Sequence, residues 1–124
     1  MNPQDISCVD ARSVVRSTLS EVCSALQPTQ ARRLLEDALL VVSELTANAL
    51  LHAGGVTRLT SRVTGGRLIL EVSDGSRAIP TNRQPERGVP GGYGWGVIHR
   101  LCARVHVEAD EGGGKTISAA LALP

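Results

Sequence analysis

Aromatic residues are almost missing from this sequence, which has one Trp, one Tyr and no Phe among its 124 residues. The hydrophobic core must therefore be built from Leu, Val, Ile and Ala. An excess of positive charge is missing as well, because 13 basic residues stand against 12 acidic ones. This balance leaves no surplus to neutralise a phosphate backbone, so a nucleic acid is not expected as a partner.

Cysteine is scarce too, and its three positions are far apart, without the CxxC spacing of a zinc site. An odd number of cysteines favours free thiols over structural disulfides, and free thiols are typical of a reducing cytoplasm. No apolar run is long enough to span a bilayer, and the first residues lack the pattern of a signal peptide. We therefore expect a cytoplasmic protein with no membrane segment, folded as one domain over 1–124.

The hydrophobic period divides the chain into helices and strands. Apolar residues at helical spacing predict three helices, over 10–27, 30–51 and 96–104, the second with Thr29 as its N-cap. Alternating residues predict four strands, over 57–63, 67–73, 105–109 and 117–123. The polar stretch 75–91 exceeds the usual connection length, as functional lids and disordered segments do. This order favours helices that cover one face of a largely antiparallel sheet, an α+β layered domain.

The second predicted helix carries a polar seam. Val41, Leu50 and Leu51 add to its apolar stripe, so it is apolar on most sides and is expected to be buried. Yet Glu44 and Asn48 lie one turn apart, with His52 a further turn on. Burial of a carboxylate requires a partner or a hydrated cavity, which predicts a pocket over this helix. An amide oxygen suits Mg²⁺, and a carboxylate can deprotonate an attacking hydroxyl. The same spacing also fits a solvated edge of an amphipathic helix.

Two other segments have the chemistry of a nucleotide site. The glycine-rich stretch 91–96 directly precedes a predicted helix, whose N-terminus points free N–H groups at an anion such as phosphate. A flexible hinge has a similar composition. Asp74 ends a predicted strand, where it forms an Asx turn or accepts a hydrogen bond from an exocyclic amine such as that of adenine.

A fourth segment looks like the end of a Walker A loop. Gly114, Lys115 and Thr116 match its last residues, but that pattern needs a glycine where Ala109 stands and a helix after Thr116. Residues 117–121 alternate like a strand instead. The segment is therefore not a Walker A loop.

Taken together, four blocks in this order resemble the GHKL ATPase superfamily, which includes histidine kinases, type II topoisomerases and Hsp90. The helix block 43–52 is similar to its N-box, 72–75 to its G1 box, 92–96 to its G2 box, and 114–116 to a G3-like element. The short chain resembles the stand-alone branch of bacterial anti-sigma factors and serine-protein kinases. The resemblance implies a Bergerat fold, with helices layered on a mixed, mainly antiparallel sheet.

The resemblance also implies a function. The protein would bind ATP and Mg²⁺ and act as a serine-protein kinase on an anti-anti-sigma partner, as an anti-sigma factor that binds a sigma factor, or as both. Family members of this branch are commonly homodimers. The alternatives are an ATP- or ADP-binding switch without phosphotransfer and a slow ATPase that activates water.

Residue roles follow from the same resemblance. Glu44 would be the general base on a serine hydroxyl, and Asn48 would ligate Mg²⁺. Asp74 would accept from the adenine amine, helped by Thr116 through water. The other ATP-binding positions would be three glycines that wrap the phosphates and a histidine that braces the pocket or lid, namely Gly92, Gly94, Gly96 and His52.

Overall fold

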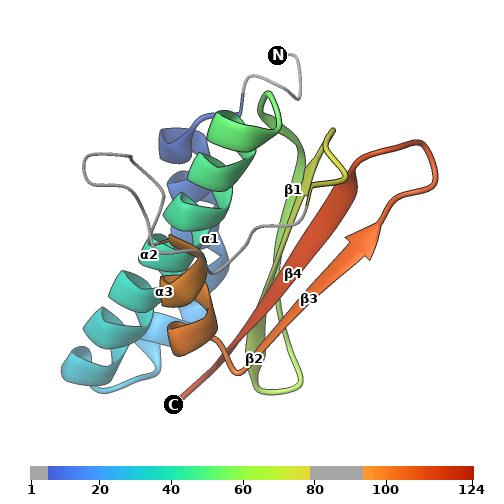
Figure 1. Ribbon diagram of the computed structural model, residues 1–124. Helices are drawn as coiled ribbons and strands as arrows, with labels where there is room; N and C mark the ends of the chain where they lie inside the picture. Colours follow the sequence, from blue (N-terminus) through green and yellow to red (C-terminus); the bar gives the residue numbers. More distant parts are fainter. Residues whose placement is uncertain (1–5, 79–93) are drawn as a thin grey trace.

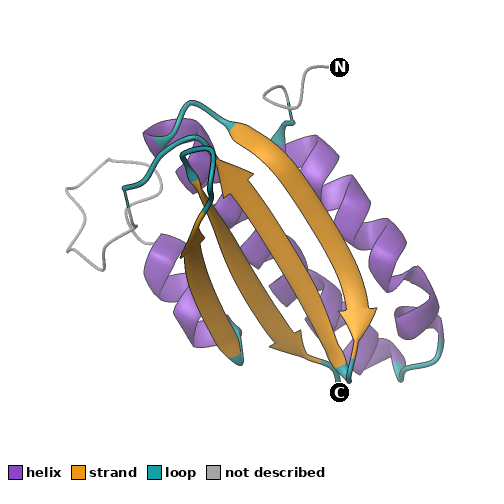
Figure 2. Cartoon of the chain, turned by 90° about the vertical axis from the view of Figure 1, so that its right-hand side faces the viewer, coloured by secondary structure: helices purple, strands orange, loops and turns teal. Residues whose placement is uncertain are grey.

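The computed structural model describes residues 6–78 and 94–124, which form helices on one side of a sheet (Figure 1). In chain order the elements are α1 (Cys8–Ser24), α2 (Pro28–His52), β1 (Val56–Thr64), β2 (Arg67–Asp74), α3 (Gly94–Leu101), β3 (Arg104–Ala109) and β4 (Lys115–Ala122). Figure 2 views the open face of the sheet, with the helices behind it. None of the described helices is long and apolar enough to cross a membrane.

The sheet has four strands in the order β1-β2-β4-β3, and each described pair of neighbours is antiparallel. A tight turn at Gly65 and Gly66 joins β1 to β2, whereas β2 and β4 pair across a long stretch of sequence. The α+β prediction is confirmed. The predicted strands are confirmed as well, with ends that differ by one or two residues.

The core lies between the sheet and α2. Because successive side chains of a strand point to opposite faces, residues paired across β2 and β4 share a face. Three such rows are buried against the helices: Leu68 with Leu121, Leu70 with Ala119, and Val72 with Ile117. The next row in the same direction is Asp74 with Lys115. The three apolar rows of the core are therefore followed on the same face by a charged pair, Asp74 and Lys115.

The ends of the helices follow from capping chemistry. Ser7 caps α1 by accepting from the N–H of Asp10, whose carboxylate accepts from the N–H of Ser7 in return. The prediction that Thr29 caps the second helix is wrong, because α2 begins two residues earlier than predicted, at Pro28, after the N-cap Gln27. Proline suits the first helical position, where its missing N–H costs nothing.

The prediction that α2 is buried on most sides is wrong for its last turn. Val41 is fully buried, but Leu50 and Leu51 are 46% and 52% exposed. At about 100° per residue they point away from the direction of the buried Ala49. The described elements cover α2 on the sides that face α1, α3 and the sheet. Leu50 and Leu51 lie on the remaining side of α2, which these elements leave uncovered.

Candidate functional site

Glu44 and Asn48 lie one turn apart on α2, on the side that meets the start of α3. Gly94, the first residue of α3, is buried directly against Glu44. A Cβ atom built on Gly94 would overlap the Glu44 carboxylate. The absence of a side chain therefore lets the beginning of α3 approach this carboxylate closely. The structure thus places Gly94 against Glu44, with Asn48 one turn further along α2, and the predicted pocket over this helix stays a prediction.

The side-chain amide of Asn48 is a buried polar group that lacks a partner. Its Nδ2 atom is buried without a hydrogen bond to any described residue, and the whole residue is only 7% exposed. The buried hydroxyl of Thr46, on the same helix, is satisfied because it donates to the carbonyl of Val42 at 2.7 Å. A buried polar group without a partner costs about 1–3 kcal/mol, so a ligand or water near Asn48 would stabilise this arrangement.

Asp74 ends β2 and is buried in an ion pair with Lys115, which begins β4. The Lys115 Nζ lies 2.9 Å from Asp74 Oδ1, and both side chains are about 95% buried. The N–H of Ser76 donates to the same Oδ1 at 2.9 Å, which is the Asx turn that the sequence offered as the alternative to an adenine acceptor. Lys115 also donates to the carbonyl of Ser76 at 3.2 Å. This turn and ion pair hold the Asp74 carboxylate in one place.

Thr116 does not lie on the same face of the sheet as Asp74 and Lys115. It pairs with Ser73 in the register, so both point to the face of the sheet opposite to Asp74. Its hydroxyl lies 2.7 Å from that of Ser73 and donates to Asp110 at 3.0 Å. Lys115 takes the position beside Asp74 that the sequence reading assigned to Thr116. The alternation of residues 117–121 could have revealed this, because it puts Lys115 on the core face.

The remaining predicted positions are Gly96, His52 and Gly92. Gly96 is half-buried in the first turn of α3, and His52 is exposed at the last turn of α2. Gly92 lies outside the described residues. Trp95 packs against the core, and its ring meets His99 edge-on with ring centroids 4.6 Å apart. The Trp95 ring is thus engaged with the core and with His99.

The first turn of α3 provides backbone donors beside Glu44. The first N–H groups of a helix have no partner within the helix and favour an anion such as phosphate. Figure 1 shows α3 beside α2, and the junction of β2 with β4 at the upper right of the sheet. The carboxylate of Glu44 and the donors at the start of α3 therefore lie together, with Asn48 one turn further along α2.

The family-model comparison identifies the fold. Residues 8–121 match the model of the histidine kinase-like ATPase domain. This chain belongs to that family. The GHKL resemblance and the Bergerat fold are therefore confirmed, while the anti-sigma and serine-kinase branch stays a prediction.

Solved structures include domains of similar fold. The histidine kinase domain of the Erythrobacter litoralis EL346 blue-light activated histidine kinase is 27% identical with a TM-score of 0.50, over 88% of this chain and 61% of that one. A further structure of that blue-light activated histidine kinase is 27% identical with a TM-score of 0.49, over 72% of this chain and 31% of that one. This chain thus spans less than two thirds of either neighbour. No curated protein matches the sequence.

The residues of this family member fit ATP with Mg²⁺. The side-chain oxygen of Asn48 is of the ligand type that Mg²⁺ prefers, and its buried Nδ2 donor, which has no described partner, fits an acceptor such as a phosphate oxygen. Glu44 lies against the start of α3, so its negative charge would oppose a phosphate there unless a cation lay between them. The donor set therefore fits a nucleotide that arrives with its metal.

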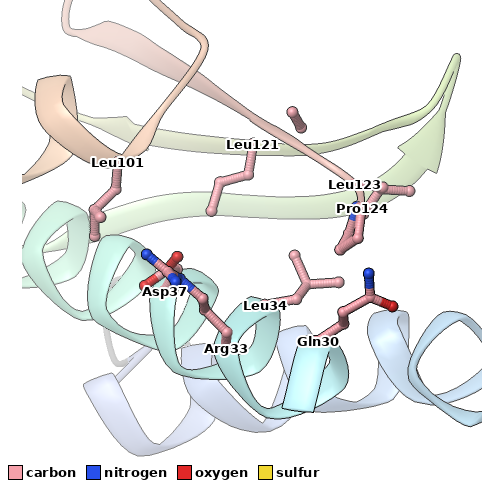
Figure 3. Close-up of a pocket in the computed structure, with 9 residues that line it drawn as sticks. Gln30, Arg33, Leu34, Asp37, Leu101, Leu121, Leu123 and Pro124 are labelled. Atoms are coloured by element: carbon pink, nitrogen blue, oxygen red, sulfur yellow. The ribbon is translucent and has the colours of Figure 1, made fainter. Parts of the chain in front are cut away.

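A separate cavity lies at the other end of α2 (Figure 3). Its volume is about 400 Å³, and its wall combines residues from the first turns of α2 with the end of β4. Leu34, Leu101 and Leu121 form its apolar side, and Arg33 and Asp37 lie at its polar side. None of the residues predicted to bind ATP lines it. This cavity is therefore not part of the candidate site.

Proposed function

We propose that this protein binds ATP·Mg²⁺ between α2, α3 and the junction of β2 with β4. The observation that carries the proposal is the buried Nδ2 donor of Asn48, which has no partner among the described residues, one turn from Glu44, whose carboxylate lies against the start of α3. In this arrangement Asn48 ligates Mg²⁺ and Asp74 accepts from the adenine amine. The N–H groups of Gly94 and its neighbours receive the phosphates. Mg²⁺ would neutralise phosphate charge when it is bound.

We further propose that the protein transfers the γ-phosphoryl group to a serine of a partner protein. Glu44 would accept the proton of the attacking hydroxyl, because a carboxylate within reach of the acceptor can act as a general base. The phosphoryl group passes from the β–γ bridging oxygen of ATP to the serine oxygen, and ADP leaves. The partner would be an anti-anti-sigma protein in the cytoplasm, and the same surface would also bind a sigma factor.

The match to histidine kinase domains makes the acceptor the main question. A histidine acceptor would place this domain in a conventional histidine kinase, whereas a serine acceptor would place it in the serine-kinase branch that the sequence analysis predicted. The two products differ chemically, because a phosphoserine ester survives acid and a phosphohistidine does not. Acid treatment of the labelled product therefore separates the two readings.

The experiment uses ATP labelled at its γ-phosphate, first with this protein alone and then with a purified anti-anti-sigma protein. Acid-stable label on a serine of the partner, absent with Glu44→Gln, supports the proposal. Acid-labile label points to histidine transfer instead. Release of inorganic phosphate without any labelled protein supports a slow ATPase, and ATP binding without turnover supports a switch module.

A further inference from the structure

The buried ion pair of Asp74 and Lys115 extends the core rows of β2 and β4. The two residues are directly opposite in the register, one row beyond Val72 and Ile117. Their side chains therefore lie on the helix-covered face of the sheet. A Cβ atom at Gly114 would overlap the carbonyl of Asp74, so the glycine allows the two strand ends to approach this closely. The pair is thus held at a defined place on the same face as the core.

Both partners keep hydrogen-bonding capacity beyond their contact with each other. Lys115 has three N–H donors, and it donates to Asp74 Oδ1 at 2.9 Å and to the carbonyl of Ser76 at 3.2 Å. Oδ1 also accepts from the N–H of Ser76. Within the described residues, Oδ2 of Asp74 receives no hydrogen bond, and one donor of Lys115 remains. The pair therefore keeps one acceptor and one donor without a described partner.

Stability alone gives little reason for this pair. A buried ion pair brings modest net stabilisation because both charges lose water, and an apolar pair of similar volume is often as stable. The three preceding rows are apolar and buried, so an apolar pair would continue them. The spare donor and acceptor have a clearer use toward a ligand that offers the complementary groups.

We infer that Lys115 recognises the adenine base together with Asp74. This inference rests on the proposed function, that is, on ATP binding at this site. The Watson–Crick edge of adenine presents an amine donor at N6 beside an acceptor at N1. Asp74 Oδ2 accepts from the amine, and Lys115 donates its remaining hydrogen to N1. Asp74 alone would recognise only the amine at N6, whereas Asp74 and Lys115 together recognise two neighbouring positions of adenine, N6 and N1.

The test compares ATP with 1-deaza-ATP, in which a C–H group replaces N1 and the amine is kept. Isothermal titration calorimetry measures both nucleotides with Mg²⁺ on the wild type, on Lys115→Met and on Arg62→Met. Arg62 forms an ion pair with Glu71 at 2.8 Å, from β1 to β2, and is more than half exposed. The Arg62→Met variant therefore controls for the loss of an ion pair with a residue of β2.

The wild type and Arg62→Met should bind ATP about 10-fold to 100-fold more tightly than 1-deaza-ATP, because a hydrogen bond from a charged donor is lost. Lys115→Met should bind both nucleotides with nearly equal affinity. Equal affinities in the wild type would overturn the inference even if Lys115→Met fails to fold, and so would discrimination that persists in Lys115→Met. Tighter binding of GTP than of ATP would also overturn it. No ATP binding by the wild type would overturn the proposed function as well.

Discussion

Gly94 lies so close to the carboxylate of Glu44 that no side chain fits between them. The relationship connects two segments that are 50 residues apart in the sequence, the polar seam of α2 and the start of α3. It also gives the glycine a specific purpose, which is to let the helix donors and the carboxylate share one site.

Gly94→Ala should separate catalysis from folding. The added methyl group meets the far end of the flexible Glu44 side chain, which can turn away, and Gly94 is the first residue of α3, where the preference of a helix interior for alanine does not apply in full. The free energy of unfolding should therefore change by less than about 1 kcal/mol. Displacement of the carboxylate should lower phosphoryl transfer by about 100-fold. Urea denaturation and the γ-phosphate assay measure the two effects.

Gly112→Ala is the matched control, because a Cβ atom at Gly112 meets nothing within 4 Å. It should leave both the stability and the rate nearly unchanged. Wild-type phosphoryl transfer by Gly94→Ala would show that the contact with Glu44 does not matter for the reaction.

Glu44→Gln should keep ATP affinity while it abolishes most turnover. Glutamine has nearly the same shape but cannot accept a proton, and the loss of a general base typically lowers rates by about 10²–10⁴-fold. Glu36→Gln, an exposed position on the same helix, is the control and should behave like the wild type. Full activity of Glu44→Gln would remove Glu44 from the role of base.

Asn48→Ala should lose the dependence of ATP affinity on Mg²⁺. We expect affinity in the presence of Mg²⁺ to fall by about 10-fold or more, since a metal ligand is removed. Folding should remain intact, because the variant also removes a buried atom without a partner. Calorimetry with and without Mg²⁺ measures the first effect and thermal denaturation the second.

Ser61→Ala is a control for Asn48→Ala, since the Ser61 hydroxyl is the other buried side-chain group without a partner among the described residues. Removal of this hydroxyl should leave nucleotide binding unchanged. If Asn48→Ala retains a Mg²⁺ effect equal to that of the wild type, the metal assignment is wrong.

Cys102 should react slowly with iodoacetamide at pH 8. Burial disfavours the thiolate and raises the pKa of the Cys102 thiol from 9.0 to about 11, so little nucleophile is present. In the folded protein the rate of Cys102 alkylation should increase with pH until about pH 11. In urea the same rate should stop increasing at about pH 9. The neutral thiol favours the folded state fully below pH 9, and this contribution is lost as the pH rises toward 11. Mass spectrometry of the labelled peptide follows the rate, and equal profiles in both states would contradict the assigned burial.

The sequence predicted the α+β class and most elements because hydrophobic periods of helices and strands are strong signals. Glu44 and Asn48 were found because polar residues one turn apart interrupt an apolar helix. The cap at Thr29 was misplaced because proline at the first helical position also looks like a helix end. Lys115 was missed because its neighbours imitate a Walker A loop, although the alternation of residues 117–121 already places Lys115, and not Thr116, on the core face. The contact of Gly94 with Glu44 depends on tertiary packing, which no local pattern contains.

The most direct test of the account is a calorimetric titration of the wild-type protein with ATP, with and without Mg²⁺. The account predicts saturable binding at one site per chain that tightens when Mg²⁺ is present. Absence of binding under both conditions would contradict it, and the fold would then serve as an interaction scaffold without a nucleotide.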